Sequence, residues 1–163
     1  MAVPATTATT AAVSRQYDAF PYPRRDPADE REVLRLASPS NILELNHLVW
    51  RGRRDFTRPL RVLVAGGGTG DSVVCLAQQL HDLQCPARLV CVDLSRASLR
   101  VCAARLRRRR LPCVMDSEQC GGDDDDESTV RVTLVCASIL DLAQLGLGGM
   151  CQCPLKISLL WVY

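Results

Sequence analysis

The stretch LRVLVAGGGTGDSVVCLAQQL, residues 60–80, decides the fold of this chain, together with LVCVDLS at residues 89–95. Val62 to Ala65 form a short continuous apolar run, which is expected of a parallel strand covered on both faces. The four glycines that follow, at positions 66, 67, 68 and 70, let the backbone turn sharply and approach a ligand where a Cβ would collide with it. The pattern predicts a strand that runs into a ligand-binding glycine loop.

A helix and a second strand complete this motif. Apolar residues recur at helical spacing between Val73 and Leu83, and the polar residues between them are left for water. Leu89 to Val92 form a second apolar run that predicts a strand, and Asp93 lies at its carboxyl end. Open α/β sheets place their ligand contacts at the carboxyl ends of the strands. The glycines and Asp93 therefore predict a nucleotide-type cofactor site.

The spacing of the glycines distinguishes between two cofactor classes. A dinucleotide fingerprint requires G-x-G-x-x-G, whose third glycine packs the helix closely on the strand. Counted from each of the three leading glycines, that third position holds Asp71, Ser72 or Val73. An aspartate at a helix N-terminus suits the helix dipole but repels a pyrophosphate, whereas a ligand with a sulfonium and an amino group tolerates it. The loop favours a cationic or zwitterionic adenosyl ligand.

With LVAGGGTG at residues 63–70, the chain resembles the class I S-adenosylmethionine-dependent methyltransferases. The resemblance implies that Gly66, Gly68 and Gly70 wrap the methionine part of the cofactor and that Asp93 takes both ribose hydroxyls. Val64 stands where this family usually has an acid that reaches the cofactor's amino group. Asp71 is close enough in sequence to be considered as a partial replacement.

Two further segments extend the resemblance. Residues 137–139, after an apolar run at 132–136, take the place where the family brings backbone and a small polar side chain to the adenine ring. YDAFPYP at 17–23 matches the leader of one branch of the family, and its tyrosines either pack over a pocket or anchor the tail. The residues expected to bind S-adenosylmethionine are Ala65, Gly66, Gly67, Gly68, Thr69, Gly70, Asp71, Asp93, Leu94, Ser138 and Ile139.

These features predict an α/β chain with the Rossmann-like class I methyltransferase fold. We expect a three-layer sandwich with a mostly parallel sheet. The sheet is expected to be incomplete, with only the first three to four strands of the fold present and residues 157–163 as a candidate fourth strand. N-terminal helices precede it, one starting at Asp26-Pro27 and one over residues 40–50. The expected parts are a disordered tail at 1–16, a helical cap at 17–58, the cofactor-binding domain at 59–150 and a diverged or truncated end at 151–163.

The resemblance implies a methyltransferase whose acceptor the sequence does not name; protein, small metabolite, lipid quinone and RNA all stay open. A truncated, catalytically silent cofactor-binding or scaffold fragment is the alternative. It is motivated by Val64 and by the expected absence of the second half of the fold; no candidate base follows the third strand, apart from Asp141. An NAD-dependent oxidoreductase is the third interpretation. No catalytic residue is assigned, although His47 and Asn46 lie on a helix expected near the site.

Charge and composition indicate few further partners. The net charge of +2 implies no strong electrostatic partner, and we expect the run Arg105 to Arg110 to be a solvated helix end rather than a nucleic-acid patch. DDDDE at 123–127 is typical of an exposed loop.

No apolar run of the sequence is long enough to span a bilayer, so no membrane partner is expected. The cytoplasm is the default compartment, with organelle or nuclear targeting and the oligomeric state left open.

The cysteines predict core packing rather than a metal site. Four of them lie inside apolar runs and fit a reducing compartment: Cys75, Cys91, Cys102 and Cys136. Structural zinc sites typically use pairs of cysteines spaced by two to four residues. Among the others, only Cys151 and Cys153 come near that spacing, so no metal is predicted.

Overall fold

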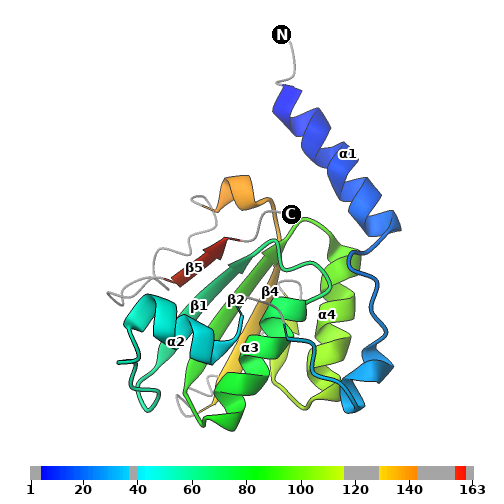
Figure 1. Ribbon diagram of the computed structural model, residues 1–163. Helices are drawn as coiled ribbons and strands as arrows, with labels where there is room; N and C mark the ends of the chain where they lie inside the picture. The colour runs from blue at the N-terminus through cyan, green and yellow to red at the C-terminus, as the bar shows by residue number, and fades with distance from the viewer. Residues whose placement is uncertain (1–4, 37–39, 116–128, 143–156, 161–163) are drawn as a thin grey trace.

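The computed structural model describes residues 5–36, 40–115, 129–142 and 157–160. Within these ranges the chain forms one sheet in the order β3-β4-β2-β1-β5, and every neighbouring pair of strands is parallel (Figure 1). The strands are β1 (Leu60–Ala65), β2 (Ala87–Asp93), β3 (Cys113–Met115), β4 (Val130–Cys136) and β5 (Ile157–Leu160). The chain is therefore an α/β protein with a parallel sheet, as the sequence predicts.

β1 is the point in the sheet from which successive strands are added on opposite sides. The chain moves from β1 to β2 and β4 on one side, and β5 pairs with β1 on the other side. The register aligns Ala65 with Val92, and Val92 with Val135, so β1, β2 and β4 finish together. The loops that leave these strands consequently meet at one edge of the sheet, which is where open α/β sheets bind ligands.

Three of the strands confirm the apolar runs recognised in the sequence, since β1, β2 and β4 contain residues 62–65, 89–92 and 132–136. β5 lies within residues 157–163, which were expected as a fourth strand. The short strand β3 is an addition, and it gives the described sheet five strands where three to four were expected. The acidic run at 123–127 and most of the end at 151–163 lie outside the described residues.

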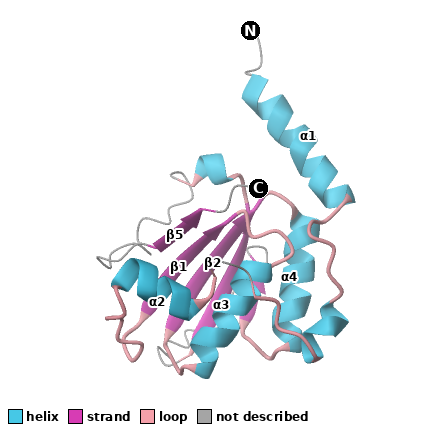
Figure 2. Ribbon diagram, viewed as in Figure 1, coloured by secondary structure: helices cyan, strands magenta, loops and turns pink. Residues whose placement is uncertain are grey.

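The helices pack on one face of this sheet. α2 (Ile42–Trp50), α3 (Asp71–Asp82) and α4 (Arg96–Arg108) lie in front of the strands in Figures 1 and 2. Side chains of these helices and alternate residues of β1, β2 and β4 form the main core; among the described residues, the opposite sheet face carries a small cluster built on Val90, Val92 and Val135. Among the described elements, α2, α3 and α4 thus form one layer on one face of the sheet, and the expected three-layer sandwich stays a prediction.

The N-terminus also differs from the disordered tail expected for residues 1–16, because α1 spans Ala5–Ala19. Alanine has the highest helix propensity, but an isolated helix of this length is marginal in water without further contacts. The carboxylate of Asp18 supplies such contacts, accepting hydrogen bonds from Ser95 Oγ at 2.9 Å and from the backbone N–H of Ala97 at 3.0 Å. These bonds lower the pKa of Asp18 and hold the C-terminal end of α1 against the start of α4.

The cap between α1 and the sheet is less helical than expected. Asp26 caps only a short 3-10 helix, Pro27–Arg31, by accepting the N–H of Ala28 at 2.8 Å. α2 confirms the second predicted helix: Ile42, Leu45 and Trp50 are buried, whereas Leu43, Leu48 and Val49 are exposed. In the described part of the chain, no helix is long and apolar enough to cross a membrane.

Candidate functional site

The glycine loop joins β1 to α3 in a conformation that excludes side chains. Gly68 has φ +51°, and a Cβ there would lie 2.6 Å from the backbone oxygen of Tyr22. Gly70 has φ +99°, and its Cβ would lie 2.5 Å from Cys102 Sγ. A Cβ on Gly67 would overlap Cys91 Sγ. Because they lack side chains, the glycines let the loop fit between an N-terminal segment and the core. They also leave the backbone free to approach a ligand.

Asp93 ties this loop to the next one. Its Oδ2 accepts a hydrogen bond from the N–H of Gly68 at 2.7 Å, and its Oδ1 accepts one from the N–H of Ser95 at 2.8 Å. A carboxylate offers about four acceptor positions. Two acceptor positions therefore remain on Asp93 for ligand hydroxyls.

Residues 14–25, which we call the leader, pass over both loops. Near the start of the leader, Ser14 Oγ donates to the backbone oxygen of Leu94 at 3.3 Å. Near its end, Thr69 donates to the leader backbone, from Oγ1 to the oxygen of Pro23 at 2.7 Å. The two anchors place the leader across the carboxyl ends of β1 and β2, so the segment becomes one wall of the site.

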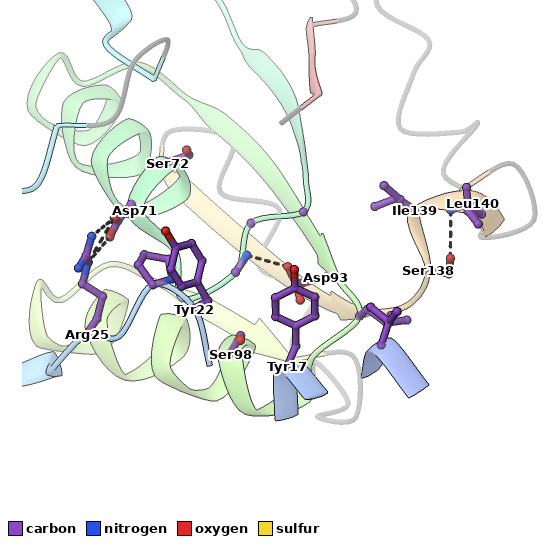
Figure 3. A pocket seen from close by; sticks show the side chains of 16 residues that line it. Tyr17, Tyr22, Arg25, Asp71, Ser72, Asp93, Ser98, Ser138, Ile139 and Leu140 are labelled. Carbon is purple, nitrogen blue, oxygen red and sulfur yellow. Dashed lines mark hydrogen bonds and ion pairs between the residues drawn. The ribbon is translucent and has the colours of Figure 1, made fainter. Parts of the chain in front are cut away.

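The leader, the glycine loop and the loops after β2 and β4 line a cavity of about 560 Å³ that is open to solvent on one side (Figure 3). This volume lies within the usual range for small-molecule sites. The lining comprises Val13, Tyr17, Tyr22, Pro23, Arg25, Gly66, Gly67, Gly68, Asp71, Ser72, Asp93, Leu94, Ser98, Ser138, Ile139 and Leu140.

Most of the predicted cofactor residues line this cavity together, but Ala65, Thr69 and Gly70 do not. Ala65 and Thr69 are buried, and Gly70 directly precedes α3. The sequence did not place Arg25, Ser72, Ser98 or Leu140 at the site. The leader tyrosines Tyr17 and Tyr22 do line the cavity, which was one of the two roles considered for them.

A chain of ion pairs supports one end of the cavity. Asp71 accepts from Arg25 Nε at 2.9 Å and from Arg105 Nη1 at 2.7 Å. Arg105 Nε donates to Glu30 Oε1 at 2.6 Å, and Arg109 Nε donates to Glu30 Oε2 at 2.6 Å. The side chains of Arg105 and Glu30 are 0% and 1% exposed. This corrects the expectation that the arginine run is a solvated helix end, because its first member is a buried structural group.

The electrostatics at Asp71 follow from this arrangement. Burial acts to raise the pKa of the Asp71 carboxyl, but the hydrogen bonds from Arg25 and Arg105, with their positive charges, outweigh it. The pKa of Asp71 is consequently lowered, and the group stays ionised. Arg105 Nη1 also donates to the backbone oxygen of Thr69 at 2.9 Å, so the same guanidinium fixes the glycine loop.

The remaining candidate residues differ in whether they line the cavity. Ser138 Oγ accepts the N–H of Leu140 at 3.2 Å and caps the 3-10 helix Ile139–Asp141, which leaves its hydroxyl hydrogen available to donate. His47 is exposed on α2 and does not line the cavity. Asn46 Oδ1 accepts the N–H of Arg54 at 3.1 Å. Val64 is fully buried in the core, away from the cavity lining.

The cysteines confirm their predicted place in part. Cys75, Cys91 and Cys102 are fully buried, and Cys136 is half-buried. Cys151 and Cys153 lie outside the described residues.

Comparisons with known proteins find no matching family model, no matching curated protein and no matching solved structure.

Proposed function

We propose that this chain binds S-adenosylmethionine in the cavity and is a methyltransferase. The observation that carries the proposal is the junction of Asp93 with the glycine loop: a carboxylate at the end of β2 holds Gly68 and still has two free acceptor positions. A ribose diol needs such an acceptor beside a loop that lacks side chains. The cavity of about 560 Å³ offers room for one adenosyl ligand.

The order of chemical groups along the cavity also supports this ligand. Figure 3 shows Arg25 and Asp71 at one end, Asp93 in the middle, and Ser138, Ile139 and Leu140 at the other end. S-adenosylmethionine has a charged amino-acid group, a ribose and a flat adenine in the same sequence. Asp93 would take the ribose hydroxyls, and Leu94 with Ile139 would contact the adenine ring.

The distinction from a dinucleotide rests on spacing rather than on charge. Asp71 has two guanidinium partners, so its charge alone does not repel a pyrophosphate. However, its side chain occupies the position that a dinucleotide fingerprint reserves for glycine. NAD is therefore the ligand to test against S-adenosylmethionine.

S-adenosylmethionine supplies an activated methyl group when it is bound. The residues of this chain would orient the donor and exclude water from it, with the leader as the covering wall. The main competing function is binding without turnover. It is favoured by one observation: among the described lining residues, both carboxylates are already hydrogen-bonded, and none is a histidine, cysteine or lysine.

Calorimetric titration with S-adenosylhomocysteine tests the binding step, with NAD as a second ligand. We expect the wild-type chain to bind S-adenosylhomocysteine and the Asp93→Ala variant to lose that binding. Asp82→Ala, which removes an exposed carboxylate at the far end of α3, should bind normally. Absence of binding by the wild type, or binding of NAD alone, would overturn the proposal. Transfer of a labelled methyl group to an acceptor panel then separates an enzyme from a silent binding protein.

A further inference from the structure

The connected ion pairs that begin at Arg25 and Asp71, at one end of the cavity, contain more positive than negative groups. The connected ion pairs contain three guanidinium groups, on Arg25, Arg105 and Arg109, and two carboxylates, on Glu30 and Asp71. Arg105 and Glu30 are buried behind the wall, whereas Arg25 and Asp71 line the cavity. An anionic group in the cavity would balance the excess.

Asp71 has little capacity left for a ligand. Its Oδ1 accepts from Arg25 Nε and from Arg105 Nη1, and its Oδ2 accepts from Arg25 Nε at 3.2 Å and Nη2 at 2.5 Å. These contacts use about all four acceptor positions of a carboxylate. The role considered for Asp71, as an acceptor for the cofactor's amino group, is therefore disfavoured by its own partners.

Arg25 has donors to spare. A guanidinium group has five N–H donors. In Arg25, Nε and one N–H of Nη2 bond Asp71, and one N–H of Nη1 bonds the backbone oxygen of Arg24 at 3.1 Å. One N–H on each terminal nitrogen remains, and the side chain is 23% exposed. Among the described residues that line the cavity, Arg25 is the only cation.

We propose that Arg25 binds the carboxylate of the ligand's amino-acid group, and that Asp71 is a positioning residue that holds the Arg25 guanidinium toward the cavity. The inference rests on the proposed function, since it places the methionine end of S-adenosylmethionine beside the glycine loop. Two N–H groups of one guanidinium match the two oxygens of a carboxylate, and such charge-assisted pairs are among the stronger hydrogen bonds in proteins.

The test compares two ligands that differ only at this end. S-adenosylhomocysteine carries the amino-acid group, whereas 5′-methylthioadenosine has the same adenosyl part without it. Arg25→Gln should weaken S-adenosylhomocysteine binding by about tenfold or more, as expected for losing a charge-assisted pair, and should leave methylthioadenosine binding unchanged. Arg24→Gln is the matched control, because Arg24 is exposed, adjacent and equally charged but does not line the cavity.

The outcomes separate this inference from the proposed function. Equal weakening of both ligands by Arg25→Gln would show that Arg25 only shapes the cavity, and unchanged binding of S-adenosylhomocysteine would show that it makes no contact; either result overturns the inference. If the wild-type chain binds neither ligand, the proposed function itself fails. Methylthioadenosine binding by the variant also verifies that the leader still closes the cavity.

Discussion

Replacement of Arg105 by methionine is the sharpest test of the ion pairs behind the cavity. The guanidinium is 0% exposed and bonds Glu30, Asp71 and the backbone oxygen of Thr69. Removing one partner of a buried ion pair costs about 3–5 kcal/mol, because the other charge stays buried without full compensation. For a chain of this length each kcal/mol lowers Tm by about 2–4 °C, so a fall of about 6–20 °C is expected.

The measurement is thermal unfolding followed by circular dichroism, with Arg108→Met as the control. Arg108 belongs to the same arginine run and the same helix but is exposed, so its replacement should change stability by less than about 0.5 kcal/mol. A double variant that also carries Glu30→Gln should lose less than the two single losses added together, because the buried carboxylate that loses one of its two arginine partners in Arg105→Met is then absent. Equal, small effects of Arg105→Met and Arg108→Met on stability would refute the buried network. They would support the interpretation of the arginine run as a solvated helix end.

Two further outcomes are expected. Gly68→Ala should destabilise the chain more than Gly52→Ala in urea unfolding, because both have positive φ but only Gly68 faces a backbone oxygen, that of Tyr22; the strain alone costs about 1–2 kcal/mol, and equal losses would contradict the contact. The lowered pKa of Asp71 contributes stability that is present above the ordinary aspartate value of about 3.9 and is lost as pH falls through the folded value. Asp71→Asn should therefore flatten the acid limb of a stability–pH curve, and an unchanged limb would show that Asp71 contributes nothing there.

The local motif of the site was predictable, whereas its walls were not. The glycine loop and Asp93 lie within one strand–helix–strand unit, so their spacing in sequence fixes their proximity in space. Arg25 reaches Asp71 across 46 positions, and Glu30 reaches Arg105 across 75, and no local pattern encodes such pairs. One signal for Arg105 does exist in hindsight, because it follows the buried Cys102 by three positions, on the inner face of α4.

The sequence could not assign the covering of each sheet face, and it did not predict the N-terminal helix α1. The apolar runs predict strands covered on both faces, but periodicity cannot say which segment covers each face. The alanine- and threonine-rich start looks like a tail because it has no amphipathic pattern. Its helix is held instead by long-range hydrogen bonds: Ser14 donates to Leu94, and Asp18 accepts from Ser95 and Ala97.

Two sulfur atoms lie directly beneath the glycine loop. Cys102 Sγ would lie 2.5 Å from a methyl group on Gly70, and Cys91 Sγ would overlap one on Gly67. The glycine loop therefore rests on the core with no spare layer between them, and interiors packed this closely transmit added volume. A bulkier residue at position 91 or 102 would push the loop outward, toward the cavity. Positions 67 with 91, and 70 with 102, are thus expected to vary as matched pairs, so the interior of the domain limits which ligands fit above it.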